Sequence, residues 1–194
     1  MTSKSFYQDQ AQAYFEQTFG VDPSSFLQPL SQYLQPGAHI LDVGCGAGRD
    51  MLWLQKRGFN CTGLDCSPAL ADLARRHTGL PVIEADFESF EFQGLDMDAL
   101  LLVGALVHVP HERFQLIFAR ILSALKLHGH VLVTMKQGQG EQTRPDGRVF
   151  YLWPKDDLMH IFEDCGLNCL EYFEQQSKIR ASDIWMSFVL QIQA

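Results

Sequence analysis

The sequence lacks the marks of a membrane protein, of a secreted disulfide-rich protein and of a structural zinc site. No stretch approaches the roughly 20 apolar residues needed to span a bilayer, and residues 1–12 do not resemble a secretory signal. The five cysteines form an odd set without a CxxC pair, which argues against a disulfide framework. We therefore expect a cytoplasmic protein with reduced thiols at Cys45, Cys61, Cys66, Cys165 and Cys169.

Positive charge and metal-binding patterns are also scarce. Fifteen lysines and arginines stand against 23 acidic residues, giving a formal net charge of −8. Nonspecific binding to nucleic acid needs several phosphate-neutralising cations, so we expect small molecules or proteins as partners. The histidines form no H-E-x-x-H pattern, and we predict no metal. Nothing in the sequence indicates an oligomeric state.

What is present is the pattern of one α/β domain. The 194 residues are 46% hydrophobic and 20% charged, which suits a single domain over residues 1–194 with an ordinary core. Helical segments at 6–19 and 23–36 form an N-terminal cap over residues 1–36, and alternating strands and helices follow. The last two strands lack a helix between them and should pair antiparallel. Strands are expected at 39–43, 60–64, 81–84, 97–103, 131–135, 168–173 and 184–191.

A glycine-rich turn follows the first predicted strand. Gly44, Gly46 and Gly48 alternate there, so backbone can approach a ligand beside the free N–H groups of the next helix. A tight turn without a ligand is the alternative. The spacing G-x-G-x-G differs from the dinucleotide-binding G-x-G-x-x-G, and no P-loop pattern occurs. The preceding Asp42 would repel a pyrophosphate but suits an ammonium group, which favours S-adenosylmethionine as the ligand.

Two further acidic residues follow the next two strands. Asp65 ends the second strand, where its carboxylate can accept both ribose hydroxyls; a charge that stabilises the next helix is the alternative. Asp86 and Phe87 follow the third strand and can bind and pack against an adenine; an exposed loop carboxylate beside a core ring is the alternative. Three signals at successive strand ends predict one pocket, because open α/β sheets bind ligands at that edge.

These motifs, in this order, resemble those of class I S-adenosylmethionine-dependent methyltransferases. The resemblance covers segments 40–50, 63–68, 84–87, 98–110 and 125–134. It implies a Rossmann-like α/β fold, with a seven-stranded, mostly parallel sheet, an antiparallel last strand, and helices on both faces. It also implies that Val103, Gly104 and His108 lie near the transferable methyl group. The cofactor-binding residues that follow are Tyr14, Asp42, Gly44, Cys45, Gly46, Gly48, Asp65, Cys66, Ser67, Asp86, Phe87, Val103 and Gly104.

Within this class the sequence is most similar to the small-molecule "type 11" branch, through residues 48–50 and 106–110. The usual Lys-Pro-Gly-Gly turn is replaced by Lys-Leu-His-Gly at 126–129. The fourth-strand region also lacks the Asn/Asp-Pro-Pro-Tyr/Phe element of nucleic-acid amino methyltransferases. A small-molecule acceptor is therefore expected.

Two hypotheses concern how the methyl acceptor is bound and activated. His108 is a candidate catalytic base, because imidazole titrates near neutral pH; a histidine that only packs or hydrogen-bonds is the alternative. Residues 137–150 form a possible lid loop; Arg144 and Arg148 within it, together with Lys136 just before it, would recognise an anionic acceptor. The competing interpretation of that loop is an exposed turn at 145–147 flanked by solvated charges.

The resulting functional prediction is methyl transfer to an O, N or S atom of an unidentified small molecule, with S-adenosylhomocysteine as product. A noncatalytic adenosylmethionine-binding or regulatory domain is the alternative. A nicotinamide-dependent oxidoreductase is a third possibility that the glycine spacing disfavours.

Overall fold

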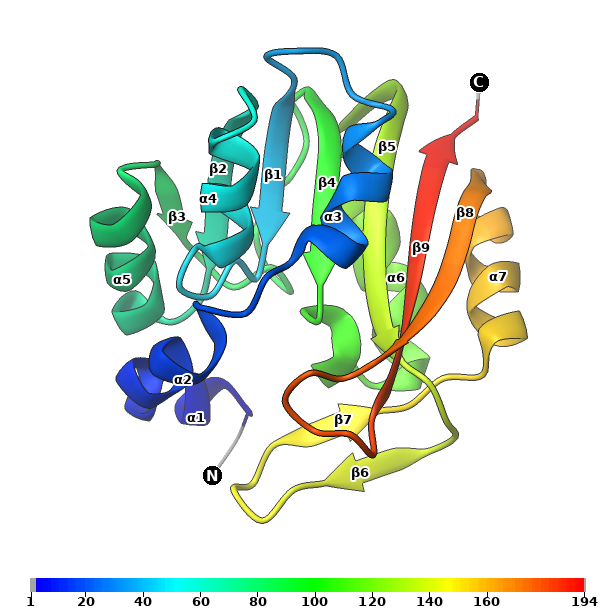
Figure 1. The fold of residues 1–194 in the computed structure, drawn as a ribbon. Helices are drawn as coiled ribbons and strands as arrows, with labels where there is room; N and C mark the ends of the chain where they lie inside the picture. The colour runs from blue at the N-terminus through cyan, green and yellow to red at the C-terminus, as the bar shows by residue number, and fades with distance from the viewer. Residues whose placement is uncertain (1–2, 194) are drawn as a thin grey trace.

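The computed structural model describes residues 3–193, in which a seven-stranded sheet forms the centre of the molecule (Figure 1). Its strand order is β3-β2-β1-β4-β5-β9-β8. All neighbours from β3 to β5 pair parallel, whereas β9 runs antiparallel to both β5 and β8. The predicted mostly parallel sheet with an antiparallel last strand is confirmed. The strands are β1 (His39–Val43), β2 (Asn60–Asp65), β3 (Val82–Glu84), β4 (Met97–Val103), β5 (Leu125–Lys136), β8 (Leu167–Gln176) and β9 (Ile184–Ile192).

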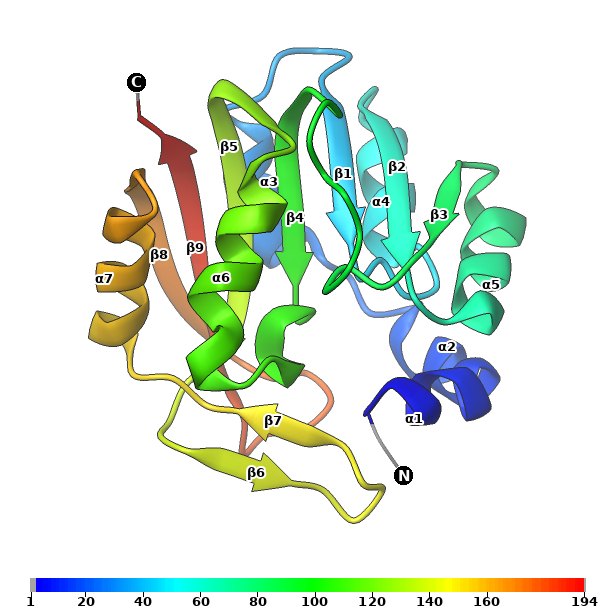
Figure 2. The same cartoon turned by 180° about the vertical axis from the view of Figure 1, so that it is seen from behind.

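Helices cover both faces of this sheet, as Figures 1 and 2 show from opposite sides. The helices α3 (Ser24–Ser31), α4 (Arg49–Gln55) and α5 (Pro68–Thr78) lie on one face. The other face carries α6 (His111–Leu122) and α7 (Lys155–Asp164), and the short 3-10 helix η1 (Leu106–His108) connects β4 to α6. Of the helices within residues 3–193, none is long and apolar enough to cross a bilayer.

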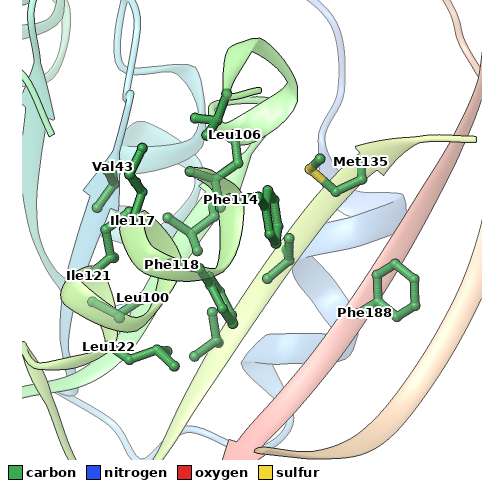
Figure 3. Packing of buried hydrophobic residues seen from close by; sticks show 14 of the residues in the cluster. Val43, Leu100, Leu106, Phe114, Ile117, Phe118, Ile121, Leu122, Met135 and Phe188 are labelled. Carbon is green, nitrogen blue, oxygen red and sulfur yellow. The ribbon is translucent and has the colours of Figure 1, made fainter. Parts of the chain in front are cut away.

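The two-residue repeat of the strands divides the core into two layers. Leu41 and Leu100 point towards α6, whereas Ile40 and Leu101 point towards α3 and α4, and all four are fully buried or nearly so. The apolar residues of α6 recur at helical spacing and meet the first layer; Phe118 is fully buried there (Figure 3). The position of β1 and β4 is thus fixed from both sides, and with it the loops at their carboxyl ends.

The beginning of α5 shows how local sequence positions one of those loops. Ser67 accepts a hydrogen bond from the N–H of Leu70, and Pro68 occupies the first turn of the helix. Gly79 ends the helix with φ of +70°. This cap holds the chain immediately after β2 in a defined turn.

Three local expectations were wrong. The helix expected over 6–19 is divided at Gln10 into α1 (Ser3–Asp9) and α2 (Ala11–Thr18), a break that the helix-favouring Gln10 does not signal. The fifth strand begins six residues earlier than expected, at Leu125. The segment expected to be a loop contains a β-hairpin, formed by β6 (Glu141–Thr143) and β7 (Val149–Tyr151).

Candidate active site

Two adjoining cavities lie at the carboxyl edge of the parallel strands. In Figure 1 this edge faces downwards, towards α1, α2 and the β6–β7 hairpin. The larger cavity has a volume of about 380 Å³ and the smaller one of about 220 Å³. Four residues line both of them and therefore stand where the cavities meet: Tyr7, Tyr14, Val103 and Gly104.

Most of the predicted cofactor-binding residues line the larger cavity, together with the candidate base. They are Tyr14, Gly44, Gly46, Asp65, Cys66, Phe87, Val103, Gly104 and His108. The remaining predicted residues are not part of that lining; they are Asp42, Cys45, Gly48, Ser67 and Asp86. The larger cavity is also lined by Tyr7, which the sequence offers with Tyr14 as an aromatic ligand contact, and by residues that the sequence did not indicate, namely Ser3, Lys4, Leu70, Glu88, Ala105 and Val109.

Asp65 connects the glycine turn to the end of β2. Its Oδ2 accepts the N–H of Gly46 and its Oδ1 accepts the N–H of Ser67, both at 2.8 Å. Gly46 adopts φ of +56°, a conformation that suits glycine. The side chain of Asp65 is buried, and this burial raises the pKa of its carboxyl group. The result is a rigidly oriented carboxylate with lone pairs still available to a ligand hydroxyl.

The predicted residues that do not line the larger cavity contribute to the structure around it. Asp42 is buried with its Oδ2 unpaired among residues 3–193, and burial raises its pKa well above the usual value. A Cβ at Gly48 would lie 2.8 Å from Cγ2 of Thr78, so this glycine permits the close contact of α4 with α5. The carboxylate of Asp86 pairs with the ammonium of Lys4 at 2.5 Å. Ser67 donates to the Gln8 side chain at 2.9 Å, and Lys4 and Gln8 both belong to α1, so α1 is anchored at two points.

The hydrogen bonds of His108 define which of its nitrogens carries the proton. Its Nδ1 lies 2.6 Å from the carbonyl oxygen of Val149, which can only accept, so the proton is on Nδ1. Its Nε2 is therefore an acceptor, and the hydroxyl of Tyr7 donates to it at 2.9 Å. Desolvation lowers the pKa of His108 to about 4, so the imidazole is neutral at physiological pH.

The three cations predicted to bind the acceptor all line the smaller cavity. They are not solvated: Lys136 and Arg144 share the carboxylate of Asp183, at 2.6 and 2.8 Å. Arg148 pairs with Asp146 at 2.8 Å, and its guanidinium stacks on Phe6 with 4.1 Å to the ring centroid. The predicted turn at 145–147 is present, but the interpretation of solvated flanking charges was wrong, because Arg144 and Arg148 are paired with carboxylates and are only 8% and 17% exposed.

The loop between β8 and β9 supplies residues that sequence reasoning missed. Lys178, Arg180 and Asp183 of this loop line the smaller cavity, and Trp185 of β9 does so as well. No local motif marks them. The only signal was indirect: an antiparallel last pair of strands returns the chain to the carboxyl edge of β5, where Lys136 ends the strand opposite Trp185.

Sequence comparisons find methyltransferases among the relatives of this chain. The model of the family described as a methyltransferase domain matches residues 40–129. A ubiquinone biosynthesis O-methyltransferase of Coxiella burnetii is 29% identical over 115 residues, covering 54% of this chain and 49% of the relative. The chain thus spans about half the length of the curated relatives it matches first.

Solved structures share the fold at low sequence identity. The 1,6-didemethyltoxoflavin-N1-methyltransferase of Burkholderia thailandensis, solved with bound 1,6-didemethyltoxoflavin and S-adenosylhomocysteine, matches with a TM-score of 0.78 and 18% identity. That alignment covers 98% of this chain and 85% of the other. Magnesium protoporphyrin IX methyltransferase of Synechocystis, with bound S-adenosylhomocysteine, also gives a TM-score of 0.78 at 14% identity, covering 98% and 97% of the two chains. Residues 40–129 thus match a methyltransferase-domain family, and the chain as a whole shares the fold of these two methyltransferases.

Proposed function

We propose that the chain is an enzyme that transfers a methyl group from S-adenosylmethionine to an O, N or S atom of a small molecule. The observation that carries this proposal is the pair of cavities that meet at Tyr7, Tyr14, Val103 and Gly104. One cavity would hold the methyl donor and the other the acceptor, and their junction would hold the two reacting atoms. S-adenosylhomocysteine would be the product.

The larger cavity fits the donor in size and chemistry. Its volume of about 380 Å³ lies within the usual range of ligand pockets. Asp65 presents an oriented carboxylate for the ribose hydroxyls, while Leu70 and Phe87 offer apolar surface to the adenine. Gly44 and Gly46 leave the backbone open beside the methionine end. Cys45, Gly48 and Ser67 would act behind this surface, and Asp42 and Asp86 would act through neighbouring residues.

S-adenosylmethionine would supply an electrophilic methyl group carried on a sulfonium. The protein then has to align the acceptor, exclude water and, where the acceptor carries a proton, accept it. Tyr7 and Tyr14 would form the wall between the two ligands, with ring centroids 5.2 Å apart and ring planes at 85°. The helices α1 and α2 would close this wall as an N-terminal cap, and the β6–β7 hairpin would form a lid on the acceptor side.

We further propose that His108 acts as the base through the hydroxyl of Tyr7. Tyr7 lines both cavities, whereas His108 lines only the larger one, so Tyr7 is the member of the pair that reaches the acceptor. As the acceptor loses its proton to the oxygen of Tyr7, the phenolic proton moves to Nε2 of His108. The carbonyl of Val149 fixes the ring by holding Nδ1–H.

Isothermal calorimetry with the purified protein tests the first proposal. S-adenosylmethionine and S-adenosylhomocysteine should each bind at one site with micromolar affinity, and NADH should not bind. Binding of NADH without the other two ligands would replace the proposal by a nicotinamide-dependent activity. For the second proposal, Tyr7→Phe should lower kcat for a protonated acceptor while S-adenosylhomocysteine affinity stays within about twofold. An unchanged kcat would remove Tyr7 from the proton path.

A further inference from the structure

The smaller cavity carries an excess of positive charge in a chain whose formal net charge is −8. Six cationic side chains line it: Arg49, Lys136, Arg144, Arg148, Lys178 and Arg180. Four carboxylates stand against them. Asp22 and Asp183 belong to the lining, and Asp50 and Asp146 pair with lining arginines from behind. Two positive charges therefore remain without a carboxylate, and the cavity attracts anions.

Part of this excess is buried, in a cluster of Lys136, Arg144 and Asp183. The side chains are only 6%, 8% and 11% exposed, respectively. The carboxylate accepts from Nζ of Lys136 at 2.6 Å and from a guanidinium nitrogen of Arg144 at 2.8 Å. One carboxylate thus faces two cations. An uncompensated buried charge is costly, and desolvation lowers the pKa of Lys136. An anion that enters the cavity would replace the missing countercharge.

The same cluster borders aromatic surface. The ammonium of Lys136 lies 3.8 Å from the centre of the Phe150 ring and 5.4 Å from that of Trp185. Phe150 and Trp185 both line the cavity, as does Tyr7 at the junction with the donor cavity. Apolar ring surface next to an anion-binding group is suited to a ligand with a flat apolar body and one acidic group.

We propose that the methyl acceptor is a small organic acid with a single carboxylate on an aromatic or similarly flat body. This inference rests on the proposed function, because it assigns the smaller cavity to the acceptor. The acid's carboxylate binds at the cluster of Lys136, Arg144 and Asp183, with Arg180 of the β8–β9 loop contributing charge from the rim. Its ring packs on Phe150 and Trp185. The nucleophilic atom then points towards Tyr7 and the donor cavity.

Benzoate and its neutral analogue benzamide are suitable probes, because they share a ring and differ in charge. Each is titrated into the protein saturated with S-adenosylhomocysteine and followed by ligand-observed NMR. Benzoate should bind about tenfold more tightly than benzamide, since a charge-assisted contact replaces a neutral one. Lys136→Met should weaken benzoate about tenfold and leave benzamide unchanged. Lys126→Met is the matched control: Lys126 lies on the same strand, is 44% exposed at its side chain and pairs with Asp98.

Arg180→Gln is the second variant, because Arg180 lies on an exposed loop and its loss should not impair folding. It should weaken benzoate severalfold, and it decides the matter if Lys136→Met does not fold. Equal binding of benzoate and benzamide, the absence of binding by both, or benzoate affinity unchanged in the folded variants would each overturn the proposal. If inorganic phosphate displaced benzoate at an equal concentration, the site would bind a phosphate group rather than a carboxylate, and the proposal would be overturned. If calorimetry shows no binding of S-adenosylhomocysteine, the two probes are compared on the protein alone, and discrimination between them there would contradict the proposed function but not the anion site.

Discussion

Replacing His108 by asparagine should make folding less sensitive to acid. The folded protein holds His108 neutral until about pH 4, whereas an unfolded histidine takes up a proton near pH 6.5. Because the folded pKa is lowered, the stability that this residue contributes is complete above pH 6.5. It is lost progressively as the pH falls towards 4. The asparagine amide nitrogen stands at the position of Nδ1 and can keep the hydrogen bond to Val149.

The size of the effect follows from the two pKa values. Between about pH 8 and pH 5, this one histidine should cost the wild-type protein about 2 kcal/mol of unfolding free energy. Other groups also contribute to the pH dependence of stability; burial raises the pKa of Asp42 and Asp65, for example. Their contributions cancel when the pH dependence of His108→Asn is subtracted from that of the wild type.

Urea unfolding at the two pH values measures this difference. His128→Asn is the matched control, because it makes the same substitution at an exposed histidine whose φ of +64° asparagine tolerates. The control should lose as much stability as the wild type, and His108→Asn about 2 kcal/mol less. If His108→Asn loses as much as the wild type, the imidazole is not held neutral and the argument for a relay through Tyr7 is refuted.

Three further substitutions test the site and the core. Asp65→Ala should weaken S-adenosylhomocysteine binding about tenfold or more in calorimetry, through lost ribose hydrogen bonds, whereas Asp72→Ala, at an exposed carboxylate, should not. Phe118→Ala should destabilise the protein by about 3–5 kcal/mol in urea; Leu116→Ala, 66% exposed on the same helix, should cost less than about 0.5 kcal/mol. Gly63→Ala would place a Cβ 2.7 Å from a buried sulfur and should cost about 1–3 kcal/mol. Equal effects in either matched pair, or a neutral Gly63→Ala, would contradict these assignments.

The centre of the sheet could be predicted because its strands β1 and β4 are apolar runs closed by a turn signal. His39–Val43 and Met97–Val103 were predicted with the bounds that the structure shows. The hairpin of β6 and β7 could not, because β6 is polar throughout and β7 is only three residues long, too short to show an alternating pattern. It is held by contacts between residues that are distant in sequence, such as the hydrogen bond from Nδ1 of His108 to the carbonyl oxygen of Val149.

The residues of the candidate site also fall into those that the sequence could identify and those that it could not. Residues next to strand ends could be selected from motifs, since the fold brings those ends to one edge. Their ligand-binding roles remain predictions. Asp183 could not be selected, because its role depends on ion pairs with Lys136 and Arg144. These residues come into contact with it only when β9 pairs with β5. Tertiary charge pairing of this kind leaves no local pattern.

The position of α1 has a practical consequence for handling the protein. Ser3 and Lys4 line the larger cavity, and α1 has no fully buried residue; its polar anchors and the half-buried ring of Tyr7 hold it in place. A polypeptide joined ahead of α1 would therefore be attached close to residues that line this cavity. The end of β9 lies at the opposite edge of the sheet (Figure 1). An affinity tag or surface tether therefore belongs after β9, away from the residues that line the two cavities.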